Sequence, residues 1–431
     1  MPEIQPFRAI RYNSTRFGSD WTALVAPPYD VLTADDKARL LEQSPFNIVG
    51  VDMPFVPPKQ AGPPEVYRQA AETLRAWLAG GILARDEKPA IYVYHQSYRW
   101  GGRDYTRRML LAAMRLEEFG KGAVLPHELT HGGPKEDRLM LMRATRCQLS
   151  PVFGLYSDPS NAVAGVLERG AKRADVTAAL GEVVHRMWIE TDADTIRQVS
   201  TRLAGTAVYI ADGHHRYSTA LNYRNEAAAA AGGALSAEHP ANFVLIGLCA
   251  MEDPGCVILP THRVLSGLGG LKAADLMRVW APVCSFAPAG LPAGDTAKLI
   301  EPGAPHDIAL YAPEEKRYYV GTFTNRGILE RLSPDRSRAW RGLDLAYLHR
   351  CMFEESLTAG ALKGSPPGVA YTPSIEEAER MAAETGGVAI LVKPTAMAEL
   401  RAVADANDFM PQKSTFFYPK LATGMVIYPL A

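Results

Sequence analysis

The sequence lacks paired cysteines. It has five cysteines among 431 residues, an odd number, and none stands in a Cys-x-x-Cys pair. Disulfide frameworks and structural zinc sites both use cysteines at short, regular spacings. We therefore expect reduced thiols in a cytoplasmic protein, and neither a disulfide-rich fold nor a structural zinc site.

Long hydrophobic runs are absent as well. The longest candidate, residues 243–250, has the length of a buried strand, whereas a membrane-spanning helix needs about 20 apolar residues. The N-terminal residues MPEIQPFRAIRY contain no apolar core of the kind found in signal peptides. We expect a protein with no membrane partner.

The sequence has no excess of charge of either sign. Its formal net charge is −1, and it contains no basic run of five or more residues. Nucleic-acid-binding proteins usually carry a basic excess, so this balance argues against a nucleic acid as partner. With 47% hydrophobic and 22% charged residues, the composition is that of a globular enzyme.

Four common catalytic motifs are also missing: the Walker loop G-x-x-x-x-G-K-[ST], the dinucleotide motif G-x-G-x-x-G after a strand, the zinc motif H-E-x-x-H and the nucleophile elbow G-x-S-x-G. The sequence therefore argues against a Walker ATPase, a Rossmann dehydrogenase, a zincin and an α/β-hydrolase.

Strand and helix patterns alternate along the chain and predict a mixed α/β (α+β) fold. The length exceeds what one hydrophobic core usually organises, so we expect regions at 1–150, 151–285 and 306–431, with a Pro- and Gly-rich linker at 288–305. Alternating apolar residues around turn residues predict three hairpins: 90–98 with 105–116, 243–250 with 256–260, and 307–311 with 318–323. Residues 368–406 show a strand-helix-strand-helix order, and residues 138–147 have a helical pattern.

The most informative segment is Ala207–Leu221. An apolar strand pattern ends at Asp212-Gly213, and helical spacing resumes at Arg216. A strand that turns tightly into a helix leaves the first N–H groups of the helix unpaired, and the helix dipole favours an anion there. Gly213 would let a phosphate oxygen approach the backbone. Arg216 could hold phosphate oxygens in a fork.

The other residues of this loop carry complementary chemistry. His214 and His215 could donate to phosphate or move protons, and Asp212 could bind Mg²⁺ or accept a proton. The structural alternative is that Asp212 caps the helix, one histidine is a core residue and Arg216 pairs with a surface carboxylate. Because five such residues follow one another at a strand-to-helix corner, we interpret the loop as a nucleotide-phosphate site.

Three further polar stretches are candidates. Asp30 follows the rigid Pro27-Pro28 bend and could project into a cleft, or it could simply cap the next helix. His127 and Glu128 could supply acid–base chemistry. Lys135 and Arg138 lie one helical turn apart and could bind an anion together, or they could be solvated residues at a helix start. A fourth group near the C-terminus could bind substrate or only pack on the core: Lys413, Ser414, Thr415 and Lys420.

At these motifs the sequence resembles the bacterial and archaeal family called domain of unknown function 1015. The run Ile210-Ala-Asp-Gly-His-His-Arg-Tyr217 is similar to its signature. Matching stretches are Val25–Val31, Gly133–Arg138, Met410–Thr415 and Tyr418–Lys420, and the resemblance extends from Ile4 to Pro429. The family name states no activity.

The Asp-Gly-His-His-Arg loop is also similar to the nucleotide-binding loop of the ParB/sulfiredoxin superfamily, which includes free-serine kinases. This resemblance implies a ParB/sulfiredoxin-like core, ATP or ADP with Mg²⁺ as cofactors, and a phosphotransferase acting on a small hydroxylated metabolite, with serine as the first candidate. A carboxylate near the N-terminal motif activates the serine hydroxyl in those kinases. This chain is longer than they are, and about 180 residues separate Asp30 from Asp212.

We therefore predict an ATP- or ADP-dependent small-molecule kinase, working in either direction. Gly213, His214, His215 and Arg216 would hold phosphates, and Asp212 would hold Mg²⁺. Asp30 or Glu128 would accept the hydroxyl proton. The alternatives are a ParB-like nucleotide switch and a phosphoesterase that uses His215. The sequence leaves open the substrate, the nucleotide and a homo-oligomeric state.

Overall fold

The computed structural model describes residues 3–58, 60–128, 132–170, 172–290 and 296–430, and its fold is mixed α/β as predicted. The chain forms two compact units. The first consists of Met1–Val257 and Pro419–Ala431, so the C-terminal segment returns to it, and the second consists of Ile258–Tyr418.

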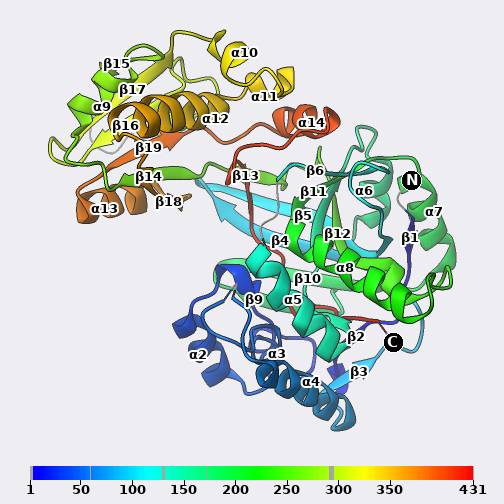
Figure 1. Ribbon diagram of the computed structural model, residues 1–431. Helices are drawn as coiled ribbons and strands as arrows, with labels where there is room; N and C mark the ends of the chain where they lie inside the picture. Colours follow the sequence, from blue (N-terminus) through cyan, green and yellow to red (C-terminus); the bar gives the residue numbers. More distant parts are fainter. Residues whose placement is uncertain (1–2, 59, 129–131, 171, 291–295, 431) are drawn as a thin grey trace. The chain divides into compact units, whose positions relative to one another are not determined.

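The first unit is built on a nine-stranded mixed sheet (Figure 1). The strand order is β6-β11-β8-β12-β5-β4-β10-β9, and β1 also pairs with β5. Two neighbouring pairs are parallel, β11 with β6 and β12 with β8, and the others are antiparallel. The strands are β1 (Ile4–Gln5), β4 (Ile91–Trp100), β5 (Arg103–Arg115), β6 (Val124–Pro126), β8 (Val152–Tyr156), β9 (Val176–Leu180), β10 (Val183–Glu190), β11 (Val208–Asp212) and β12 (Phe243–Ala250).

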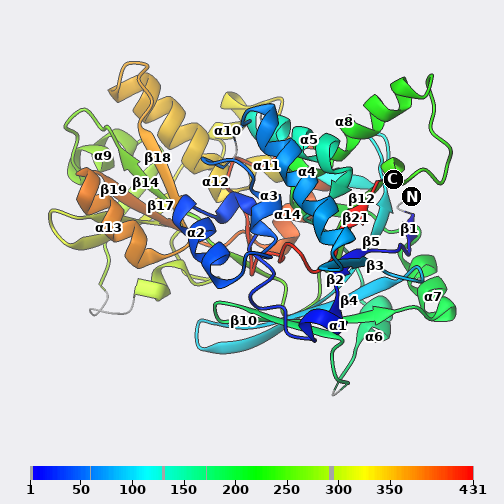
Figure 2. The same ribbon diagram turned by 90° about the horizontal axis from the view of Figure 1, so that it is seen from below.

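Helices of this unit pack on the sheet and on one another. Helix α5 contacts both α4 and α8, and Figure 2 shows α4 running beside α5. The main helices are α2 (Ala34–Gln43), α4 (Pro64–Ala79), α5 (Gly132–Thr145), α6 (Ala162–Leu167), α7 (Ala193–Leu203) and α8 (His214–Ala230). The short ones are α1 (Ser14–Phe17), α3 (Val49–Asp52), η1 (Tyr29–Val31) and η2 (Pro240–Asn242). Two small sheets pair β2 (Ile10–Tyr12) with β3 (Leu83–Arg85) and β7 (Cys147–Gln148) with β21 (Tyr428–Pro429).

Two sequence predictions about this unit are wrong in part. Helix α5 begins at Gly132 and not at residue 138, so the Gly133–Arg138 motif is its first turns. Strand β12 does not form a hairpin with the strand after it, because it lies between β5 and β8 in the sheet. That next strand, β13 (Val257–Leu259), pairs instead with β20 (Phe416–Tyr418). The predicted hairpin of β4 and β5 is confirmed.

The second unit contains a six-stranded antiparallel sheet in the order β15-β17-β16-β19-β14-β18. The predicted hairpin of β16 and β17 is confirmed, and so is the order β18-α13-β19-α14, in which β14 separates the two strands. The strands are β14 (His262–Ser266), β15 (Cys284–Pro288), β16 (Ile308–Ala312), β17 (Arg317–Phe323), β18 (Gly368–Thr372) and β19 (Val388–Val392). The helices are α9 (Ala273–Trp280), η3 (Thr296–Ile300), α10 (Ile328–Leu332), α11 (Arg338–Arg341), α12 (Asp344–Ala346), the π-helix Tyr347–Ala361, α13 (Ile375–Thr385) and α14 (Met397–Asp405).

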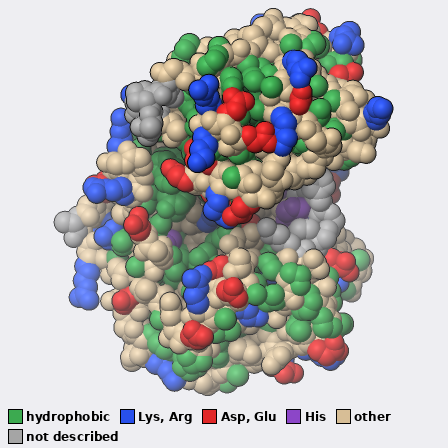
Figure 3. All heavy atoms as spheres, turned by 90° about the vertical axis from the view of Figure 1, so that its left-hand side faces the viewer, with side chains coloured by type: hydrophobic (Ala, Val, Ile, Leu, Met, Phe, Trp, Pro, Cys, Tyr) green, Lys and Arg blue, Asp and Glu red, His purple; other side chains and the backbone are tan. Residues whose placement is uncertain are grey.

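The surface carries both signs of charge. In the view of Figure 3, Lys and Arg side chains are interspersed with Asp and Glu, as expected for a net charge of −1. Within the described ranges, no helix is both long and apolar enough to cross a lipid bilayer.

Candidate functional site

The predicted corner between strand and helix lies where β11 meets α8. Strand β11 ends at Asp212, Gly213 is the N-cap with φ +86°, and α8 begins at His214. This confirms the prediction that a strand ending at Asp212-Gly213 turns tightly into a helix, and the helix starts two residues before Arg216. The pairing of β11 with β8 shifts register between Ile210 and Asp212, an irregularity that re-aims side chains beside functional sites.

Gly213 is required by this geometry for two reasons. Its positive φ lies in the left-handed region that L side chains rarely adopt. A Cβ at this position would also lie 3.0 Å from Nε of Arg216 and 3.1 Å from its Cζ. A larger residue would therefore both strain the turn and displace the arginine.

Asp212 lies between two cationic side chains of the first unit. Its Oδ2 accepts a hydrogen bond from Nη2 of Arg216 at 3.0 Å, and its Oδ1 lies 3.4 Å from Nζ of Lys420. Burial acts to raise the pKa of Asp212, but Lys420 and Arg216 outweigh it and hold the pKa well below its usual range. Asp212 is therefore ionised at neutral pH and orients both cations.

Arg216 is buried rather than at the surface of a cleft. Its guanidinium also donates to the carbonyl of Pro151, and only 8% of the residue is exposed. Burial acts to lower its pKa, but Asp212, Asp30, Tyr29 and Asp52 outweigh it, so the pKa is raised. The Asp30 bend and the Asp212–Arg216 loop therefore interact electrostatically.

Two neutral histidines, His127 and His214, contact one another where α8 begins. The rings of His127 and His214 meet edge to face, with centroids 4.8 Å apart. Nδ1 of His127 lies 2.7 Å from the carbonyl oxygen of Ile210, and the backbone N–H of His127 donates to Nε2 of His214 at 3.4 Å. Burial lowers the pKa of His127 to about 4 and that of His214 well below its usual value. Neither ring carries a charge at pH 7.

A second buried cluster surrounds Arg138, on α5. Its guanidinium contacts Asp52 at 3.2 Å and Asp137 at 2.7 Å, and it stacks 3.9 Å from the centre of the Tyr29 ring. Tyr67 donates to Asp137 at 2.7 Å, and Ser150 donates to Asp52 at 3.1 Å. This cluster thus joins the Gly133–Arg138 motif to the Val25–Val31 motif.

Asp30 differs from the other carboxylates of the site. Its Oδ1 is buried and has no hydrogen-bond partner among the described residues. Asp212, Asp52 and Asp137 each accept hydrogen bonds from side chains. Among these four carboxylates, Asp30 is the one with a fully buried oxygen that has no hydrogen-bond partner in the described part of the chain.

A cavity of about 40 Å³ lies beside the two arginines. Its polar lining includes Asp52, Arg138, Ser150, Arg216 and Thr219. Oγ1 of Thr219 is fully buried and has no hydrogen-bond partner within the described residues. At roughly 10–15 Å³ for each water molecule, the cavity has room for about two to four waters.

The other predicted residues are distributed over both units. Lys135 lies on α5, half-buried, and Glu128 directly follows His127. Lys413, Ser414 and Thr415 belong to the second unit. There Ser414 donates to the carbonyl of Pro411 at 2.5 Å, and the carbonyl of Lys413 accepts from Arg263 at 3.2 Å. A role of these three residues in substrate binding stays a prediction.

Sequence reasoning missed the residues that complete the cluster around Arg138. They are Asp52, Tyr67, Asp137 and Ser150. Asp137 stands inside the Gly133–Arg138 motif and could have been included. Asp52 follows the apolar run Ile48–Val51 and shows no local pattern, so only the tertiary structure identifies it.

Metal-binding groups are sparse. Over the described ranges, no three His, Cys, Asp or Glu side chains gather in a way that could hold a metal ion. Both oxygens of Asp212 already face cations. Mg²⁺ is commonly bound by one or two carboxylates together with substrate phosphates, so these residues could supply only one or two ligands to a metal carried by a nucleotide.

A family model covers most of the chain. Residues 4–346 match the family described as a protein of unknown function, DUF1015. The chain belongs to this family. The match includes the motifs at Val25–Val31, Gly133–Arg138 and Ile210–Tyr217, and it ends before the Met410–Thr415 motif. No curated protein matches the chain.

Several solved structures align with the chain at low TM-scores. A conserved hypothetical protein from Pyrococcus furiosus has a TM-score of 0.32 and 12% identity, covering 70% of this chain and 91% of its own. A mutant free serine kinase in complex with ADP has a TM-score of 0.34 and 10% identity, and the alignment covers 70% of this chain and 93% of that chain. A C-terminally truncated SbnI from Staphylococcus aureus has a TM-score of 0.35 and 9% identity, and the alignment covers 74% of this chain and 87% of that chain. TM-scores of this size are too low for the likeness to carry a functional assignment.

Acidification is expected to destabilise the first unit through its buried neutral histidines. In the unfolded chain a histidine is protonated below about pH 6.5, whereas His127 in the folded chain resists protonation down to about pH 4 and His214 to lower pH. The unfolded state thus binds more protons, and stability falls as pH falls from about 6.5 towards 4, by up to about 1.4 kcal/mol per pH unit for each histidine.

The measurement is the urea midpoint between pH 7.5 and pH 4.5. His214→Asn should reduce the pH dependence, and His239→Asn, outside the site, should leave it unchanged. Identical pH profiles for His214→Asn and the parent chain would contradict this prediction.

Proposed function

We propose that the chain is a phosphotransferase that moves a phosphoryl group between ATP or ADP and the hydroxyl group of a small metabolite, with free serine as the first candidate. The observation that carries the proposal is the corner at Gly213. A strand ends, a glycine with positive φ turns the chain, and a 17-residue helix begins with no side-chain cap from that residue. Such a helix start favours an anion.

The surroundings of this corner support a phosphate ligand. Arg216 and Lys420 bring two positive charges to Asp212, which can neutralise only one of them. Both cations therefore lie beside the start of α8. Phosphoryl transfer depends mainly on positioning and charge neutralisation, which these groups can supply.

In the proposed reaction the bond between the bridging oxygen and the terminal phosphorus of the nucleotide breaks. The substrate hydroxyl oxygen forms the new bond to phosphorus, and its proton passes to Asp30. The first turn of α8, with His214 and His215, holds the phosphates, and Arg216 and Lys420 balance the charge. Mg²⁺ would arrive with the nucleotide, with Asp212 as its one protein ligand. A substrate role of Lys135 and Arg138 is part of the same hypothesis.

The direct test is nucleotide binding by Gly213→Ala compared with Gly232→Ala. Both glycines flank α8 and have nearly equal φ angles, +86° and +88°, but a Cβ at Gly232 meets nothing within 4 Å. Backbone strain, about 1–2 kcal/mol, is therefore shared, and displacement of Arg216 is specific to Gly213→Ala. We expect ATP or ADP affinity, measured by calorimetry with Mg²⁺, to fall at least about tenfold in Gly213→Ala alone.

Equal nucleotide affinities of the two variants would show that the Asp212–Arg216 loop does not bind the nucleotide. If the parent chain binds neither ATP nor ADP, the proposed phosphotransferase function is wrong. Nucleotide binding without transfer to any hydroxylated metabolite would favour the ParB-like switch.

A further inference from the structure

A second polar cavity lies on the first unit. Its volume is about 680 Å³, within the range of small-molecule pockets. None of its lining residues belongs to the Asp212–Arg216 loop or to the cluster around Arg138. Strands β4, β5, β9 and β10, the segment that follows α6, and Ser19 after α1 supply the lining. The charged and polar side chains among them include His95, Ser97, Arg108, Glu168, Thr177 and Arg186.

The sheet register sets four of these side chains in one row. Thr177 of β9 lies opposite Arg186 of β10, Arg186 lies opposite His95 of β4, and His95 lies opposite Arg108 of β5. Directly opposed residues of antiparallel strands point to the same face of a sheet. Two cations, a histidine and a hydroxyl therefore cross one face from strand to strand.

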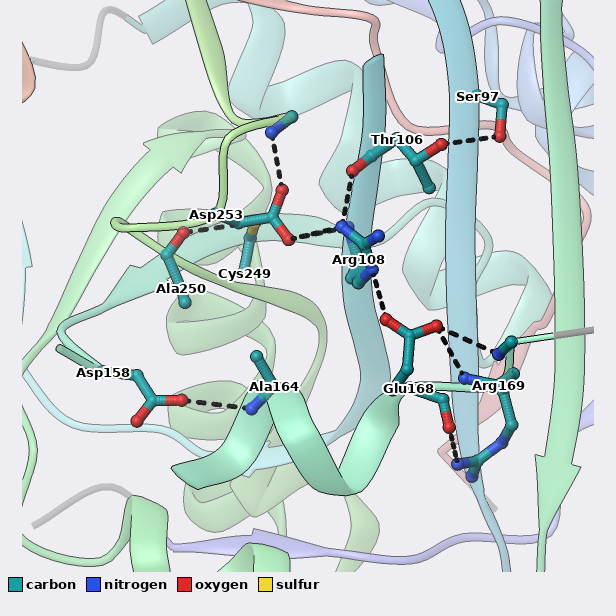
Figure 4. Close-up of polar contacts among 12 residues, drawn as sticks. Ser97, Thr106, Arg108, Asp158, Ala164, Glu168, Arg169, Cys249, Ala250 and Asp253 are labelled. Carbon is teal, nitrogen blue, oxygen red and sulfur yellow. Dashed lines mark hydrogen bonds and ion pairs between the residues drawn. The ribbon is translucent and has the colours of Figure 1, made fainter. Parts of the chain in front are cut away.

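The cavity has more positive than negative charge. Arg108, Lys172, Arg173 and Arg186 line it, against the single carboxylate of Glu168. Figure 4 shows that this carboxylate is engaged: Nε of Arg108 donates to it at 2.8 Å, and the N–H groups of Arg169 and Gly170 donate at 3.1 and 3.0 Å.

Among the described residues, the other three cations of the cavity have no acidic partner. Nη1 of Arg186 donates to the hydroxyl of Ser97 at 3.0 Å, and Ser97 in turn lies 3.1 Å from the hydroxyl of Thr106, a contact drawn in Figure 4. In the described part of the chain, neither Arg186 nor Lys172 nor Arg173 forms an ion pair. Their uncompensated charge would attract an anion into the cavity.

His95 adds an acceptor to this set of donors. The residue is 5% exposed, and its ring lies against Trp188 with centroids 4.8 Å apart. Its Nε2 is buried and has no hydrogen-bond partner within the described ranges. Burial lowers the pKa of His95 to about 4, so the ring is neutral at pH 7. A buried acceptor left without a donor costs free energy, which a donor group on a ligand would recover.

We propose that this cavity binds a small phosphate monoester that also carries a free hydroxyl group. Arg186, Lys172 and Arg173 contact the phosphate, whose three oxygens accept several donors at once. Hydroxyls of Ser97, Thr106 and Thr177 line the same space. Nε2 of His95 accepts a hydrogen bond from the ligand's hydroxyl. This site goes beyond the proposed phosphotransferase reaction, since it shares no lining residue with the Gly213 corner.

Calorimetry on the full chain tests the site with three probes: glycerol 3-phosphate, inorganic phosphate and glycerol. The parent chain should bind glycerol 3-phosphate more tightly than phosphate and should not bind glycerol. Arg186→Gln should lower the affinity for glycerol 3-phosphate and for inorganic phosphate about tenfold or more, because each ligand loses a charge-assisted hydrogen bond. Arg103→Gln removes the same charge from an exposed position at the start of β5 and should bind like the parent chain.

Two further variants test the phosphate and hydroxyl contacts separately. If Arg186→Gln does not fold, the exposed pair Lys172→Gln and Arg173→Gln replaces it. His95→Phe keeps the ring against Trp188 and should retain phosphate binding, but it should lose the preference for glycerol 3-phosphate.

The proposal is overturned if Arg186→Gln binds like the parent chain, or if neither phosphate probe binds at millimolar concentration. It is also overturned if Gly213→Ala alone abolishes binding of the probes, because they would then occupy the corner of α8.

Discussion

Asp30→Asn is expected to lower the rate of phosphoryl transfer by about 10²–10⁴-fold while leaving nucleotide affinity unchanged. The substitution keeps the size of the side chain and removes the carboxylate that would accept the substrate proton. Asp30 is suited to this role because its Oδ1 is buried without a hydrogen-bond partner among the described residues. Its negative charge also contributes to raising the pKa of Arg216, which places its electrostatic influence at the corner of α8.

The matched control is Asp35→Asn. Asp35 is exposed in the first turn of α2, five residues away, so its replacement removes the same charge without touching the site. The assay follows phosphate transfer between ATP or ADP and free serine in both directions, with Mg²⁺, while calorimetry follows nucleotide affinity. We expect Asp35→Asn to retain full activity.

Two other results would redirect the mechanism. Full activity of Asp30→Asn would show that Asp30 is not the base, and Glu128 and Asp212 would remain as candidates for that role. Asp212 is the weaker of these two because Arg216 and Lys420 occupy its oxygens. Release of phosphate from phosphoserine without any nucleotide would favour the phosphoesterase, with His215 as its nucleophile.

Arg138→Met is expected to destabilise the first unit by about 3–5 kcal/mol. Removing one partner from a buried ion pair leaves the other charges without compensation. Here two buried carboxylates would remain, Asp52 and Asp137, which lie 3.2 and 2.7 Å from the guanidinium. Burial raises the pKa of Asp52 even though the charge of Arg138 acts to lower it. Without Arg138, keeping the Asp52 carboxylate ionised would therefore cost more free energy. Stacking on Tyr29 would be lost as well.

Arg143→Met provides the control on the same helix. Arg143 pairs with Glu226 at 2.5 Å, but both side chains are about half exposed, and exposed ion pairs contribute only about 0–1 kcal/mol. Urea unfolding of the two variants should differ by several kcal/mol. Adding Asp52→Asn to Arg138→Met should restore part of the loss, because it removes one uncompensated charge.

Equal destabilisation by Arg138→Met and Arg143→Met would show that the buried cluster contributes no more than a surface pair. No recovery in the double variant would assign the loss to packing against Tyr29 in place of uncompensated charge.

The strand-to-helix corner at Gly213 was predictable because its information is local. Apolar residues before Asp212, a glycine at the turn and helical spacing after it all lie within 15 residues of sequence, and the structure has the strand and the helix start there. The hairpin of β4 and β5 was predictable for the same reason, since alternating residues surround a turn of Gly and Asp.

Partners distant in the sequence were decided only by the tertiary structure. Lys420 reaches Asp212 across 208 positions, and Asp52 pairs with Arg138 across 86. The position of β12 between β5 and β8 overrode the hairpin expected from short spacing. The row from Thr177 to Arg108 exists only because four strands share one register. Turn chemistry and periodicity act over a few residues, whereas burial and pairing are set by whichever segments the packed sheet brings together.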